Sequence, residues 1–172
     1  MRRAFATLLL IGVCTHVHAD DSRLRDLLSL LGGLKMGSSY DTVKAACRGL
    51  GPMKPDAGEG NTEAVVVATV EGVELRGEFN FARGGLVSHG FTSGTLTHAR
   101  ARDFFIHCAA EAIELYGQGK RDVVLPAEHD GPRDEIGIQL DWQKENLIFQ
   151  LGLAYRQAGA TVHWGAQGDS TK

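Results

Sequence analysis

The chain has 172 residues, of which 43% are hydrophobic and 23% charged, with 22 glycines and 4 prolines. This composition is typical of a globular chain and excludes a disordered or collagen-like one. A chain of this length buries enough surface to form one core without a metal or several disulfides. Proteins that bind nucleic acids usually carry an excess of basic residues, whereas this chain has a formal charge of -3, so we expect no nucleic-acid partner.

The N-terminal segment has the features of a secretory signal peptide. Arg2 and Arg3 precede an apolar stretch that runs to Cys14, and the segment ends at Ala19 with small residues where a signal peptidase cuts. We therefore predict that residues 1–19 are removed and that residues 20–172 form a single domain in the periplasm or outside the cell. Neither the apolar stretch nor any later segment approaches the roughly 20 apolar residues of a transmembrane helix, so no transmembrane segment is expected.

An alternative interpretation concerns Cys14, because Ile11-Gly12-Val13-Cys14 is similar to the cleavage box of bacterial lipoproteins. That box normally has a small residue before the cysteine, and Val13 stands there instead. We therefore favour cleavage after Ala19 over lipidation at Cys14. Cleavage removes two arginines and no acidic residue, which leaves 16 basic and 21 acidic residues and a formal charge of -5.

Cleavage also leaves two cysteines, Cys47 and Cys108, in a compartment where disulfides form. We predict a Cys47–Cys108 disulfide. The alternative is a reactive thiol at Cys108 with His107 as its base. Adjacent residues of a helix point about 100° apart, so His107 is poorly placed for that role.

The first half of the mature chain predicts two short helices followed by three strands. Leucines at helical spacing predict a helix over about residues 22–31, and Ser38 with Asp41 is typical of a capping box before a second helix that ends near Gly49. Residues 53–62 are predicted to be an exposed loop. Alternation of apolar and polar residues then predicts an antiparallel meander over residues 64–70, 73–81 and 86–92.

The second half repeats this pattern. Helical spacing predicts a long helix over about residues 97–116, which Gly117 ends, and residues 118–134 are predicted to be a loop. Three further strands are predicted, over residues 136–142, 147–155 and 162–164. The order of elements predicts an α+β fold, an antiparallel sheet of about six strands with helices packed on one face. The repeated order suggests a duplicated α-βββ unit.

Residues able to carry catalysis or to bind a metal form no known motif. The histidines of the mature chain lack the spacing of a metal site, and we expect them to be solvated: His89, His98, His107, His129 and His163. The charged segment 128–135 lacks the alternating oxygen ligands of a calcium loop and is also expected to be solvated. No Gly-x-Ser-x-Gly elbow and no hydrolase triad is present, so we expect no enzymatic activity, cofactor or metal.

One segment of the chain resembles a group of known proteins. The sequence LKMGSSYDTV at residues 34–43, a short helix, Gly51-Pro52 and a meander with FNFARGGL at residues 79–86 are similar to small bacterial envelope proteins of helix-helix-meander type. That group includes the small lipoprotein of the outer-membrane β-barrel assembly machinery and the secreted β-lactamase-inhibitor proteins. The resemblance covers residues 22–94 and implies a non-enzymatic binding module whose sheet or loops contact another protein. This chain lacks a convincing lipidation cysteine, because Val13 precedes Cys14, and in this it differs from the assembly lipoprotein. We therefore assign no contact residue to this chain from the resemblance.

The polar face of the predicted sheet is the candidate contact surface. Alternation places six side chains on it: Glu74, Arg76, Glu78, Gln139, Asp141 and Gln150. Our leading hypothesis is a secreted or periplasmic protein-binding module of the inhibitor, immunity or envelope-assembly type, whose partner is another envelope or secreted protein. The second hypothesis is a periplasmic binder of a small molecule or envelope ligand, and the third is a hydrolase. The pocket of the ligand binder would be walled by Trp142, Tyr155 and Trp164.

Overall fold

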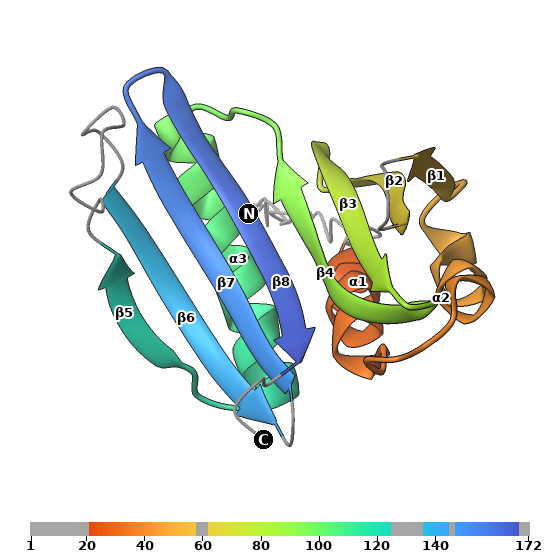
Figure 1. Cartoon of the computed structure of the whole chain (residues 1–172). Helices are drawn as coiled ribbons and strands as arrows, with labels where there is room; N and C mark the ends of the chain where they lie inside the picture. The colour runs from red at the N-terminus through yellow and green to blue at the C-terminus, as the bar shows by residue number, and fades with distance from the viewer. Residues whose placement is uncertain (1–20, 58–61, 125–135, 145–146, 169–172) are drawn as a thin grey trace, which may run out of the picture.

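The computed structural model describes residues 21–57, 62–124, 136–144 and 147–168 (Figure 1). These residues form three α-helices, one short 3₁₀-helix and eight strands. The predicted signal peptide, Cys14, and the charged segment 128–135 with His129 lie outside the described residues.

The predicted helices are present: α1 (Asp21–Gly33), α2 (Tyr40–Ala46) with the 3₁₀-helix η1 (Cys47–Gly49), and α3 (His98–Tyr116). Ser39, not Ser38, is the N-cap of α2, and its hydroxyl accepts a hydrogen bond from Thr42 N at 3.4 Å. The main chain of Ser38 is engaged elsewhere, because its carbonyl accepts a hydrogen bond from Leu86 N at 2.9 Å. The helix therefore begins one residue later than the capping-box pattern predicts.

The strands form one antiparallel sheet in the order β1-β2-β3-β4-β8-β7-β6-β5. Their bounds are β1 (Lys54–Ala57), β2 (Thr62–Val70), β3 (Val73–Ala82), β4 (Gly85–Ser93), β5 (Lys120–Val124), β6 (Ile136–Lys144), β7 (Leu147–Arg156) and β8 (Gly159–Gly168). The α+β class with an antiparallel sheet is confirmed, but the sheet has two more strands than the six predicted. The additional strands, β1 and β5, are the two edges, and both lie in segments predicted to be loops. Their sequences, KPDA and KRDVV, are too short to show alternation.

The strand order is symmetric about the centre of the sheet. β1 to β4 form one meander and β5 to β8 form another, and the last strands of the two meanders, β4 and β8, pair with each other. A helix precedes each meander, α2 the first and α3 the second. The repeated unit of this order therefore has four strands rather than the three suggested by the sequence.

All three described helices lie on the same side of the sheet, so no described helix covers the opposite face, which we call the open face (Figure 1). In this view the open face is toward the reader, α3 lies behind β6 to β8, and α1 lies between α3 and α2. The core forms between the helices and the covered face. Its fully buried large side chains include Leu24 and Leu27 from α1, Phe104 from α3, and Phe79 and Phe91 from the sheet.

The structure departs from the predicted Cys47–Cys108 disulfide, because both residues are buried free thiols. Cys47 lies at the end of α2 and Cys108 near the middle of α3, and α1 lies between those two helices (Figure 1). A disulfide requires Cα atoms within about 7 Å of each other. Helical spacing predicts that each cysteine lies on the buried side of its own helix, which is confirmed, but it does not determine whether the two helices are neighbours.

Candidate functional site

The register of the sheet places all six candidate contact residues on the open face. Side chains of directly opposed residues share a face, and successive residues of a strand alternate between faces. Glu78 opposes Gly90, Gly90 opposes Gly165, Gly165 opposes Gln150, and Gln150 opposes Asp141. The neighbouring row contains Arg76 and Gln139, and Glu74 lies further along β3. The open face therefore carries polar side chains from both meanders.

Two pairs of these residues are joined by side-chain hydrogen bonds, each pair within a single strand. Arg76 Nε donates to Glu78 Oε1 at 2.8 Å on β3, and both side chains are about half exposed. Gln139 Nε2 donates to Asp141 Oδ1 at 2.8 Å on β6. Polar groups that are already ordered lose less conformational entropy on binding, so each pair is a preorganised contact.

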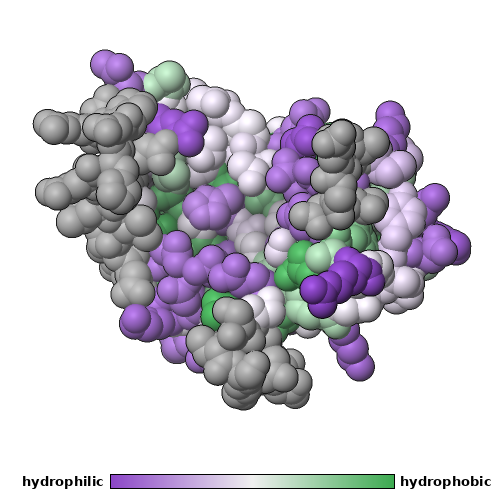
Figure 2. Space-filling view, viewed as in Figure 1, coloured by the Kyte–Doolittle hydropathy of each residue, from purple (hydrophilic) through white to green (hydrophobic). Residues whose placement is uncertain are grey.

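Glycines form the centre of the open face, between these two polar groups. Gly90 and Gly165 oppose each other across β4 and β8, and Gly152 opposes His163 across β7 and β8. The His163 ring lies over Gly152, since a Cβ atom added to Gly152 would collide with it. Burial lowers the pKa of His163. Figure 2 shows this face, on which both hydrophilic (purple) and hydrophobic (green) surfaces lie on either side of a paler centre.

The sequence contained a signal for this centre that the prediction did not use. Gly90, Gly152 and Gly165 lie inside strands, where glycine weakens the strand and often marks a close approach of another backbone. Here a Cβ atom on Gly90 would lie 2.8 Å from Trp164 O. Gly90 and Gly165 carry no side chains, so the open face leaves room beside the His163 ring for a protruding segment of a partner.

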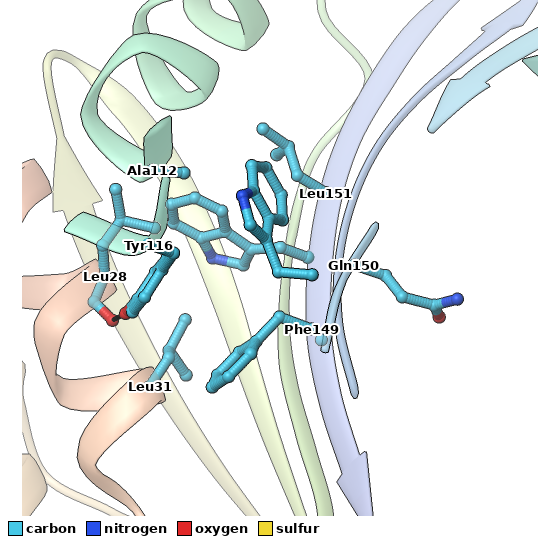
Figure 3. Close-up of a pocket in the computed structure, with 10 residues that line it drawn as sticks. Leu28, Leu31, Ala112, Tyr116, Phe149, Gln150 and Leu151 are labelled. Atoms are coloured by element: carbon cyan, nitrogen blue, oxygen red, sulfur yellow. Dashed lines mark hydrogen bonds between the residues drawn. The ribbon is translucent and has the colours of Figure 1, made fainter. Parts of the chain in front are cut away.

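The ligand-binding hypothesis requires three aromatic residues around one pocket, and the structure brings two of them together. Trp142 and Trp164 line a cavity of about 20 Å³ between α1, α3 and the sheet, together with Tyr116 and Phe149 (Figure 3). That volume is close to the minimum for one water molecule. Tyr155 instead contacts His98, with ring centroids 5.7 Å apart. Gln150 points away from the cavity (Figure 3).

The Cys108 alternative, a reactive thiol with His107 as base, has no support in the site geometry. His107 Nδ1 lies 2.7 Å from Glu71 Oε1, in a contact between α3 and the β2–β3 turn. Burial raises the pKa of the Cys108 thiol, and the Glu71 carboxylate raises it further. Burial also raises the pKa of Cys47 to about 11. Both thiols therefore stay protonated and unreactive at neutral pH.

His89 is the one expected solvated histidine that the structure finds buried among the described residues, with 3% of its surface exposed. The register of β3 and β4 shifts between Asn80 and Phe81, and Val87 is the extra residue of this bulge. A bulge reverses the alternation of the strand beyond it. His89 therefore faces the helices, and burial lowers its pKa to about 4.

Within the described ranges, no three or more His, Cys, Asp or Glu side chains gather to hold a metal ion. Of the helices described, none is both long and apolar enough to cross a membrane. Comparison of the chain with family models, with curated proteins and with solved structures found no match.

Proposed function

We propose that the chain is a non-enzymatic module, secreted or periplasmic, that binds another envelope or secreted protein through the open face of its sheet. Inhibitor, immunity and envelope-assembly proteins are the types that this proposal covers. The observation that carries it is a continuous sheet face, left uncovered by all three helices, on which both meanders contribute polar side chains. Covering such a face requires a macromolecule rather than a small ligand.

The preorganised polar pairs support this proposal. The Arg76–Glu78 and Gln139–Asp141 pairs lie on opposite sides of the glycine centre, on β3 and β6. Both pairs contain a carboxylate, so each can accept hydrogen bonds from a partner, and the Arg76 guanidinium can donate them. A partner segment that crosses the strands over Gly90 and Gly165 would extend from one pair to the other, across β4, β8 and β7.

A charge swap on the open face tests the contact surface. The variant R76E/E78R keeps the net charge and the chance of an ion pair but reverses the pattern presented to a partner. The matched control is R102D/D103R on α3, where the Arg102–Asp103 pair is 3.0 Å long and both side chains are 60% exposed. Wild-type protein and both variants are used to capture proteins from envelope extracts, and captured proteins are purified and titrated calorimetrically.

We expect the open-face swap to weaken binding by about tenfold or more, equivalent to about 1.4 kcal/mol, and the α3 swap to leave it unchanged. Equal binding by both variants would contradict the assignment of this face. A small molecule retained in native mass spectra, with no protein captured, would favour the ligand-binding hypothesis instead.

We also propose that the protein is exported and loses residues 1–19. The intact mass of the exported protein should correspond to a chain that begins at Asp20. A mass that shows an acylated N-terminal Cys14 would establish the lipoprotein alternative.

A further inference from the structure

The two meanders are joined by the pairing of β4 with β8, which we call the junction. Leaving aside the edge strands β1 and β5, it has the shortest register of any strand pair in the sheet. The register of β4 and β8 runs only from Ser88↔Gln167 to Thr92↔His163, whereas β7 and β8 pair from Leu147↔Gly168 to Arg156↔Gly159. The central pair of the junction, Gly90↔Gly165, contributes no side chain to either face. Four side-chain pairs remain: Ser88 with Gln167 and Thr92 with His163 on the open side, and His89 with Ala166 and Phe91 with Trp164 on the covered side.

His89 is a polar residue in this covered side of the junction, and both of its ring nitrogens are buried without a hydrogen-bond partner. Its ring stacks on Phe79, with centroids 6.0 Å apart. Ser93 is the other buried polar residue of the described chain, and unlike His89 it has hydrogen-bond partners. The Ser93 hydroxyl accepts a hydrogen bond from Val162 N and donates one to Gly94 O, both at 2.9 Å. Neutral imidazole is tolerated in the position of His89, but imidazolium would be a buried, unpaired charge.

The surrounding elements place no described acidic group where it could stabilise that charge. On β3 the charged residues Glu74, Arg76 and Glu78 face the open side, and from β8 the facing residue is Ala166. The charged residues of α1 with described side chains are exposed, namely Arg23, Arg25 and Asp26, as are Asp41 and Lys44 of α2. On α3, Glu111 and Glu114 contact Arg25. Burial is accordingly the only cause of the lowered pKa of His89.

We propose that His89 makes the β4–β8 junction acid-sensitive, so that its protonation separates the two meanders and divides the open face between them. The charged ring can reach water only if β4 moves away from the covered core, and the short junction is the pairing that this movement breaks. A consequence that rests on the proposed function is that acid releases the bound partner, because the contact surface spans both meanders.

The sign of the effect follows from the direction of the shift. A histidine whose pKa is about 4 in the closed state and 6.5 in the open state binds more protons when open, so closing is favoured above pH 6.5 and opposed increasingly below it. The open population should rise on the order of 100-fold between pH 7.5 and pH 4. Hydrogen exchange, corrected for intrinsic rates, should show this loss of protection at the β4–β8 amides before the β2–β3 and β6–β7 amides.

Two variants remove the titrating group, His89→Phe and His89→Leu, and near-ultraviolet circular dichroism at pH 7.5 establishes which of them folds. The folded variant should keep its protection at the junction to below pH 5. The comparison variant is His163→Gln, which removes the other histidine of this junction whose pKa burial lowers, and it should keep the larger part of the wild-type acid response. NMR titration of the His89 ring in wild-type protein supplies a measurement that needs no variant.

Three results would overturn the proposal: an unchanged acid response in the folded His89 variant, a His89 ring that titrates above pH 6, or simultaneous loss of protection throughout the sheet. These measurements use the protein alone, so they are separate from the test of the proposed function. An acid-sensitive junction in a protein that captures no partner would refute the binding role and leave the junction established.

Discussion

At the scale of single residues, Tyr116 shows what helical spacing predicts and what it omits. Its position on the apolar stripe of α3 predicts burial of the ring, and the ring does stack on Phe149 with centroids 5.2 Å apart. Spacing does not reveal that its hydroxyl donates a hydrogen bond to Leu28 O in α1. That contact requires Gly32, since any Cβ atom there would collide with the Tyr116 hydroxyl. One glycine thus determines how closely α1 approaches α3.

We expect Gly32→Ala to destabilise the protein by about 1–3 kcal/mol, because the added methyl group overlaps the Tyr116 ring and hydroxyl. Tyr116→Phe alone should cost about 1 kcal/mol through the lost hydrogen bond. In the double variant part of the Gly32→Ala cost should disappear, since the hydroxyl is gone but the ring carbon Cζ remains 2.9 Å from the new Cβ position. Urea unfolding of the four proteins measures this coupling, and strict additivity would contradict the contact.

The two cysteines give a second prediction at this scale. Native protein should react very slowly with a thiol reagent at pH 7.5, because burial raises the pKa of Cys47 to about 11 and also raises that of Cys108. After denaturation without reductant, the reagent should count two thiols. Intact mass offers a control, since a disulfide would lower the mass by two hydrogens. That loss would show that the two cysteines approach each other in the oxidised protein.

At the scale of elements, the sequence predicted the long periodic segments and missed the two short edge strands. The leucines of α1, the apolar stripe of α3 and the alternation in β3 and β7 each repeat often enough to identify the element. β1 and β5 have a few residues each and are stabilised by pairing with β2 and β6, which is a property of their neighbours. The side of the sheet on which His89 lies was also beyond prediction, because the bulge at Val87 depends on pairing with β3.

A prediction about α3 concerns its first turn. Thr97 is the N-cap, and its hydroxyl accepts a hydrogen bond from Arg100 N at 3.3 Å. Thr97→Ala should lower the free energy of unfolding by about 1 kcal/mol, because that amide loses its acceptor. Thr97→Ser keeps the hydroxyl and should change stability by only a few tenths of a kcal/mol. Chemical denaturation followed at 222 nm compares the two variants, and equal losses would show that the cap does not stabilise α3.

At the scale of the whole molecule, the sequence suggested a repeat but could not supply the arrangement of its copies. Hairpins within each meander join neighbouring segments, so their pairing follows from turn signals. The pairing of β4 with β8 joins Gly90 to Gly165, 75 positions apart, and no local pattern specifies such a contact. The candidate contact residues were found because alternation predicts which face each occupies, whereas their assembly into one continuous face depends on this single long-range pairing.

Ser93 lies at the end of that pairing and tests how the two meanders are held together. Its buried hydroxyl is the acceptor for Val162 N, beyond the last register pair, Thr92↔His163, and before the Leu96↔Ala160 bridge. Ser93→Ala removes the acceptor and leaves a buried amide without a partner, which should cost about 1–3 kcal/mol. The Val162 amide should lose protection from hydrogen exchange more than amides inside either meander, because the change weakens the junction first.

Ser88→Ala is the matched control, because it removes the same atom from the other end of the β4–β8 register. There the hydroxyl accepts a hydrogen bond from Asn80 Nδ2 at 3.1 Å, within the first meander and partly exposed, so water can replace it. Its cost should stay below about 1 kcal/mol, with no selective effect at Val162. Should the two variants lose equal stability with uniform loss of protection, the two meanders would unfold as one cooperative unit and the junction would not be the weaker pairing.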